Sequence, residues 1–167
     1  MIRIHITVPF VLLFILGACR KPVVESSLNY IPPLVFSTSI YDSLPASAVD
    51  ALKLGNITGL KIQHHDGRYA NYFEYEADKD LLLNTISSLP FSMNVVVADT
   101  TCYRIPFEAL EMIRQNLQGG ELQNTAFFWN SNRSDVEVYE CLKPPYRHII
   151  QIPKNSNRIL HRVEFTG

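Results

Sequence analysis

Residues 60–75 read LKIQHHDGRYANYFEY, the pattern of a β-hairpin and the strongest structural signal in the chain. The pair Asp66-Gly67 is favoured where both residues of a two-residue turn need positive φ, and alternating apolar residues flank it. A turn of this length pairs Leu60 with Phe73 and places alternate residues of both strands on one face. We expect the buried face to comprise Leu60, Ile62, His64, Tyr69, Asn71, Phe73 and Tyr75.

The opposite face of the hairpin carries charged and amphipathic side chains. A second set lies in the last predicted hairpin, where alternation directs two arginines outward. Aromatic and arginine side chains are enriched at the centres of protein interfaces, although a simply solvated face is the alternative. The resulting candidate partner surface consists of Lys61, His65, Arg68, Tyr72, Arg158 and Arg162.

The remaining elements extend this hairpin into an α+β fold. Apolar periodicity and capping residues predict helices at residues 45–54, 78–88 and from 106 to the Gly119-Gly120 pair. Strands are predicted at residues 34–40, 93–98, 125–129, 136–142, 148–152 and 159–165, besides the hairpin. We expect an antiparallel or mixed sheet of about six to eight strands with about three helices. The order of the first six elements is that of a ferredoxin-like βαββαβ unit.

The first nineteen residues have the layout of an export signal. Arg3 lies in a short basic start, and the apolar run from Val8 to Leu16 spans nine residues, whereas a membrane-spanning helix needs about 20. The sequence Leu16-Gly17-Ala18-Cys19 that ends it resembles the lipobox of bacterial lipoproteins. The resemblance implies that Cys19 is acylated and becomes the first residue of the mature protein.

Two alternatives to lipidation remain, an ordinary secretory signal and an uncleaved N-terminal helix. Arg20 rather than Asp follows the cysteine, and for enterobacterial lipoproteins the resemblance then implies the periplasmic face of the outer membrane. Residues 19–33 contain Lys-Pro, Ser-Ser and Pro-Pro pairs and are expected to form a flexible tether. The predicted organisation is a signal peptide at 1–18, the lipidated cysteine and tether at 19–33, and one α+β domain at 34–167.

Length and charge restrict the functional classes. Removing the signal leaves 167 − 18 = 149 residues, enough for a single domain with a core. The removed part contains Arg3 alone among charged residues, so 15 − 1 = 14 basic residues face 16 acidic ones, a net charge of −2. Nucleic acid is therefore not an expected partner.

Cys102 and Cys141 are predicted to form a disulfide, because an exported chain meets an oxidising compartment. Two buried free thiols are one alternative. The other is a reactive thiol paired in space with His148 or His161.

Other residues that could bind a metal ion or take part in catalysis have simpler explanations. His64 and His65 are adjacent in a strand and point to opposite faces, which disfavours a shared metal ion. The acidic run Glu74, Glu76, Asp78 and Asp80 fits the start of a helix. Serine-hydrolase and phosphate-loop motifs are missing from the sequence, so we expect no catalytic residue, cofactor or metal site.

These features favour a membrane-anchored envelope lipoprotein whose domain binds another envelope or secreted protein. We expect the domain to act on that partner as an inhibitor or immunity factor, or to join it as a subunit of an envelope assembly. An envelope hydrolase with an unrecognised site and a carrier of a small ligand or lipid are the alternatives.

Overall fold

The computed structural model describes residues 31–88, 102–117 and 119–165. The signal segment, Cys19 and the strand expected at residues 93–98 lie outside these ranges. The described strands are β1 (Leu34–Ser39), β2 (Thr58–Gln63), β3 (Tyr69–Glu76), β4 (Cys102–Ile105), β5 (Val136–Lys143), β6 (Tyr146–Pro153) and β7 (Arg158–Phe165). The helices are α1 (Ala46–Ala51), α2 (Lys79–Ser88), α3 (Phe107–Gln115), α4 (Gly119–Asn124) and α5 (Ala126–Trp129), with short 3-10 turns at Ile40–Asp42 and Arg133–Asp135.

The described strands form one seven-stranded sheet in the order β1-β2-β3-β7-β6-β5-β4. Every neighbouring pair is antiparallel, which confirms the predicted α+β class with an antiparallel sheet. Within this sheet, β5, β6 and β7 are consecutive antiparallel neighbours and form a meander. The ferredoxin-like prediction is wrong, because β1 pairs directly with β2, whereas a split βαβ unit places another strand between them.

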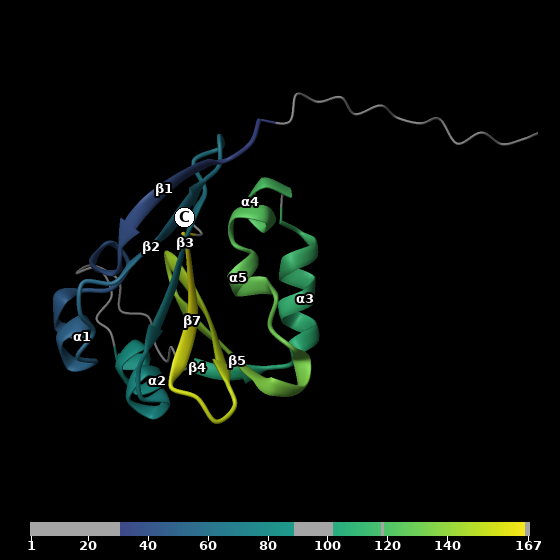
Figure 1. Cartoon of the computed structure of the whole chain (residues 1–167). Coiled ribbons are helices and arrows are strands. Elements are labelled where there is room, and N and C mark those ends of the chain that lie inside the picture. Colours follow the sequence, from purple (N-terminus) through teal and green to yellow (C-terminus); the bar gives the residue numbers. More distant parts are fainter. Residues whose placement is uncertain (1–30, 89–101, 118, 166–167) are drawn as a thin grey trace, which may run out of the picture. The chain divides into compact units, whose positions relative to one another are not determined.

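The sheet is covered by helices on both faces, α1 and α2 on one side and α3 to α5 on the other (Figure 1). Two hydrophobic clusters follow from this arrangement. The cluster under α1 and α2 includes Ile40, Phe73 and Ile86, and the cluster under α3 to α5 includes Ile62, Tyr72 and Phe128. Because both faces of β3 are buried, alternation along this strand does not separate a buried face from a solvated one.

The predicted hairpin register is wrong by one residue. The loop has three residues, His65 to Gly67, closed by the His64 N–H donating to the Arg68 carbonyl at 2.8 Å. Gly67 takes φ of 87°, the left-handed residue typical of three-residue loops. Leu60 therefore pairs with Tyr72 instead of Phe73.

The segment expected as a strand at residues 125–129 is the short helix α5. Its aromatic residues favour a strand by intrinsic propensity, but they pack on the sheet from outside it. Phe128 and Trp129 both meet the ring of Tyr72 edge-on, with centroids 5.3 and 6.2 Å away. Tertiary packing thus overrides local preference.

Local signals mark where α2 and α3 begin. The Asp78 carboxylate accepts from the Leu81 N–H at 2.8 Å and caps α2, as predicted. Pro106 precedes α3, which ends with Asn116 as its cap. The glycine pair expected to end that helix instead begins α4.

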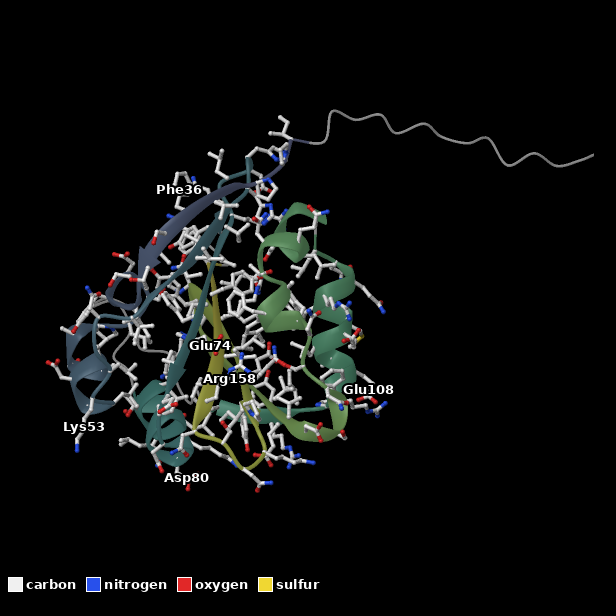
Figure 2. All side chains as sticks on the ribbon, in the orientation of Figure 1. Phe36, Lys53, Glu74, Asp80, Glu108 and Arg158 are labelled. Atoms are coloured by element: carbon white, nitrogen blue, oxygen red, sulfur yellow. A yellow bond between two sulfur atoms is a disulfide. The ribbon has the colours of Figure 1, made fainter. Side chains whose placement is uncertain are left out.

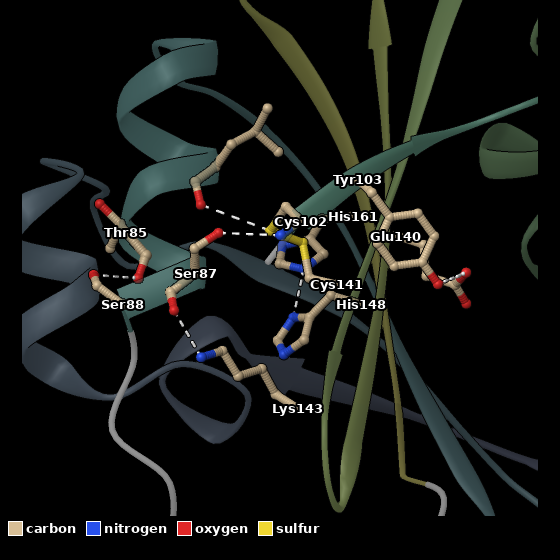
Figure 3. The surroundings of a disulfide bond; sticks show 11 residues. Thr85, Ser87, Ser88, Cys102, Tyr103, Glu140, Cys141, Lys143, His148 and His161 are labelled. Carbon is tan, nitrogen blue, oxygen red and sulfur yellow. Dashed lines mark hydrogen bonds between the residues drawn. A yellow bond between two sulfur atoms is a disulfide. The ribbon is translucent and has the colours of Figure 1, made fainter. Parts of the chain in front are cut away.

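The predicted disulfide is present between Cys102 and Cys141. The two cysteines are directly paired across β4 and β5, with Cα atoms 4.2 Å apart. β4 was not predicted as a strand. The bond fastens this four-residue strand to its neighbour at one end of the sheet order (Figure 3).

Candidate functional site

A continuous row of polar side chains crosses the sheet beneath α3 and α4. Each member contacts the next by a hydrogen bond or an ion pair. Together they link the neighbouring strands β3, β7, β6, β5 and β4 with His64, the residue that follows β2. We call this set the polar row: His64, Glu121, Tyr72, Arg162, Glu164, Arg147, Glu140 and Tyr103.

Glu121 contacts three other members of the row and is only 2% exposed. Its Oε2 lies 2.8 Å from His64 Nε2, and its Oε1 accepts from the Tyr72 hydroxyl and lies 3.3 Å from Arg162 Nη2. Arg162 Nε also donates to the Tyr72 oxygen at 2.8 Å. A buried carboxylate with this many partners satisfies its need for hydrogen bonds.

The electrostatics keep Arg162 and Glu164 charged and Tyr72 protonated. Burial acts to lower the pKa of Arg162, but its contacts with Tyr72, Glu164 and Glu121 outweigh burial and raise that pKa. Burial likewise acts to raise the pKa of Glu164, but Arg162 and Arg147 lower it overall. Burial raises the pKa of Tyr72, so its hydroxyl stays protonated and donates.

The outer half of the row continues from Arg162 to β4. Arg162 Nη1 donates to Glu164 Oε2 at 2.7 Å, and Arg147 Nη1 lies 3.9 Å from the same oxygen. Glu140 accepts from Arg147 Nε at 2.5 Å and from the Tyr103 hydroxyl at 2.6 Å. Acidic and basic groups thus alternate across the sheet.

The candidate partner surface is not a continuous face. His65, Arg68 and Arg158 are exposed, and Lys61 is half-buried with its ammonium 4.4 Å from the centre of the Tyr69 ring. Arg158 pairs with Glu74 at 2.7 Å at the surface (Figure 2).

Two members of that predicted surface point inward instead. Tyr72 is 0% exposed and Arg162 is 2% exposed, so the expectation that they face outward is wrong. The physical reason is the cover of α4 and α5 on a face that was expected to meet solvent. Glu121, which sequence reasoning missed, holds both residues there.

A second polar cluster lies on the opposite face of the sheet, beside the disulfide (Figure 3). His148 Nδ1 is 3.0 Å from His161 Nε2, and His161 Nδ1 is 2.8 Å from the Tyr75 hydroxyl. Both histidines are buried, and His148 is the direct cross-strand partner of Cys141. The Cys141 sulfur is bonded to Cys102, so it is not available as a nucleophile in this state.

We predict that this histidine pair makes the domain sensitive to acid. Burial lowers the pKa of His148 to about 4, with Lys143 adding to the effect, and burial with a contribution from His148 lowers the pKa of His161. In the unfolded chain these histidines take up protons near pH 6.5, whereas the folded pair resists protonation. The contribution of the neutral pair to stability is therefore complete above pH 6.5 and is lost as pH falls towards 4. For His148 alone, the free energy of unfolding should fall by about 2 kcal/mol between pH 7 and 5.

Urea unfolding at pH 7 and pH 5 measures this change. His148→Gln should reduce the difference between the two pH values, whereas His65→Gln, at an exposed position, should leave it as in the parent protein. An equal pH dependence in the parent and His148→Gln proteins would show that the buried pair is not its origin.

The open edge of β1 is the clearest surface feature of the domain. β1 lies at one end of the sheet order, so its outer edge has no strand partner among the described residues. Leu34, Val35 and Phe36 are 61%, 41% and 46% exposed. The strand, LVFSTS, contains neither a charged residue nor a proline, which are the usual protections of an edge strand.

Residues 31–88, 102–117 and 119–165 hold no group of three His, Cys, Asp or Glu side chains arranged to bind a metal ion. In the same ranges no helix is long and apolar enough to cross a bilayer.

The chain was compared with protein-family models, with curated proteins and with solved structures. No protein-family model matches the chain, and no significant match is found among curated proteins or solved structures. The described domain is therefore defined by its own architecture, an antiparallel seven-stranded sheet covered by helices on both faces.

Proposed function

We propose that the chain is a lipid-anchored protein of the cell envelope whose domain binds another protein along the open edge of β1. The relation to that partner is that of an inhibitor or immunity factor, or of a subunit in an envelope assembly. The anchor is Cys19, and the location is the periplasmic face of the outer membrane.

Two features support the envelope location. The lipobox-like sequence Leu16-Gly17-Ala18-Cys19 ends an apolar segment of the length expected for a signal. The disulfide between Cys102 and Cys141 fits an oxidising compartment, where such bonds persist.

The observation that carries protein binding is the uncharged, apolar edge of β1. Unpaired backbone groups along an edge strand accept an extended segment of another chain, and neighbouring side chains select its sequence. Two hollows lie next to β1, over its neighbours β2 and β3. One is lined by Phe36, Lys61 and Asn71 and the other by Ser37, Leu60 and Phe127.

A second copy of this chain is a poorer occupant than a different protein. Symmetric antiparallel pairing of two β1 strands centred on the element places each apolar residue opposite a polar one. The pairs are Leu34 with Ser39, Val35 with Thr38 and Phe36 with Ser37. A partner segment with apolar residues opposite Leu34 and Phe36 buries more apolar surface.

We predict that a photoreactive amino acid at Phe36 crosslinks the full-length chain in membranes to a different protein. Phe36 points away from the body of the domain in Figure 2. Adding Val35→Lys to the same protein should reduce the adduct at least tenfold, because a charge on the edge opposes strand addition. Mass analysis of the adduct identifies the partner.

Leu81 on α2 provides the matched control, because it is 43% exposed and lies away from β1. The same photoreactive residue at Leu81 should give no comparable adduct. Equal adducts at both positions, an adduct containing only this chain, or no adduct at Phe36 would each refute strand addition by a different protein.

The anchor has its own test. Growth with a labelled fatty acid should label the parent protein and leave Cys19→Ser unlabelled, because the thiol is the acylation site in lipoproteins. Cys102→Ser should retain the label. A labelled Cys19→Ser protein would contradict the proposed anchor.

A further inference from the structure

A cavity of about 400 Å³ lies beside the polar row. The row residues His64, Glu121, Arg162, Glu164 and Arg147 all line it. α3 supplies the opposite wall. The volume is within the range of about 300–1,000 Å³ that is usual for small-molecule sites.

The charges that line this cavity are already compensated. An anion that entered it would compete with a protein carboxylate at every guanidinium, and an amine would compete with the guanidiniums themselves. The pairs are Arg162 with Glu164 at 2.7 Å, Arg147 with Glu140 at 2.5 Å and Arg68 with Asp66 at 2.7 Å. The cavity is therefore not built for an ion.

The lining nevertheless keeps both kinds of hydrogen-bonding group. Arg147, with five N–H donors, is 30% exposed and Glu164, with two acceptor oxygens, is 26% exposed. Asn116 donates its amide N–H to the Met112 carbonyl at 2.8 Å, which leaves its carboxamide oxygen as an acceptor. His64 Nδ1 is buried and has no hydrogen-bond partner among the described residues.

The lining that α3 and the residues after it supply is mostly apolar. It comprises Ala109, Met112 and Ile113 of α3 and Leu117 after its end, with Asn116 as the polar member. One side thus offers uncharged packing surface, and the other offers fixed donors and acceptors. A purely apolar ligand would cover the charged row without replacing its contacts with water, which is costly.

We propose that this cavity binds an uncharged, hydroxyl-rich molecule of the saccharide class, with hydroxyl groups on Arg147 and Glu164 and the C–H face of a ring against α3. Hydroxyl groups donate and accept, so they use the remaining capacity of the row without breaking its ion pairs. This binding goes beyond the proposed protein contact along β1 and does not depend on it.

Nuclear magnetic resonance of the purified full-length chain tests the proposal. The probes are N-acetylglucosamine and its β-1,4-linked disaccharide, with acetate, methylammonium and alanine as an anion, a cation and a zwitterion. We expect saturable shifts of the Arg147 and Asn116 side-chain signals with the saccharides alone.

Two variants separate binding from stability. Arg147→Gln removes donors from the row, and Ala109→Phe fills the cavity from the α3 side without touching the row. Each should weaken saccharide binding at least tenfold, while Arg158→Gln, in an exposed pair outside the cavity, should leave it unchanged. The unfolding midpoint of each variant checks that it is folded.

Saturable saccharide binding that both cavity variants weaken and Arg158→Gln retains supports the site. The proposal is overturned if no saccharide binds, if the variants leave binding unchanged, or if acetate, methylammonium or alanine binds more tightly than the saccharides.

Discussion

Replacing Arg162 by methionine should lower the free energy of unfolding by about 3–5 kcal/mol, the usual cost of breaking a buried ion pair by removing one partner. Arg162 is 2% exposed and contacts Glu121, Glu164 and Tyr72. Methionine fills much of the volume, so the loss reports the missing charge. Glu121 then remains as a buried carboxylate with His64 and Tyr72 as its partners.

Chemical denaturation of paired variants checks this interpretation. Arg158→Met on the same strand removes an exposed pair with Glu74 and should cost no more than about 1 kcal/mol. Glu121→Gln combined with Arg162→Met should recover part of the loss, since the amide removes the uncompensated charge. If Arg162→Met costs no more than Arg158→Met, the polar row does not contribute the stability assigned to it.

Replacing both Cys102 and Cys141 by alanine should lower the free energy of unfolding by about 4 kcal/mol. The bond closes a loop with a sequence separation of 39, and the loss of that constraint increases the entropy of the unfolded chain. The native sheet loses its covalent link between β4 and β5, so the edge strand β4 should separate most easily.

The urea midpoints of the parent and double-alanine proteins measure this effect. Reductant should move the parent towards the double-alanine value and leave that variant unchanged, which separates this bond from other effects of reduction. A native mass two hydrogens below that of the reduced form identifies the bond directly. A parent protein with free Cys102 and Cys141 thiols after export would contradict the pairing.

The sequence predicted much of the fold through short-range signals. The pair Asp66-Gly67 located the first hairpin, and Asp78 and Pro106 located the starts of α2 and α3. The same pair left the loop length open, because a glycine with positive φ fits loops of two or three residues. That difference shifted the register by one residue. Tyr72, and not Phe73, therefore pairs with Leu60 and shares its face of the sheet.

The candidate site depended on contacts between distant parts of the chain. Glu121 is 57 residues from His64 and 41 from Arg162 in sequence, and nothing in the local sequence GGELQN separates it from a surface glutamate. The local sequence around Arg162 gives no sign of its contact with Glu121, so alternation along the strand predicts a solvated arginine. A helix that packs over a strand decides which polar residues become buried, and local sequence does not report that packing.

The polar row also determines how the sheet opens in the native state. Six of the strands are joined by the row, either directly or through His64 next to β2, so none of them can separate without breaking a polar contact of the row. β1 has no residue in the row. Amide hydrogens of the six linked strands should exchange with solvent as one cooperative unit, while β1 opens and exchanges on its own, ahead of the rest.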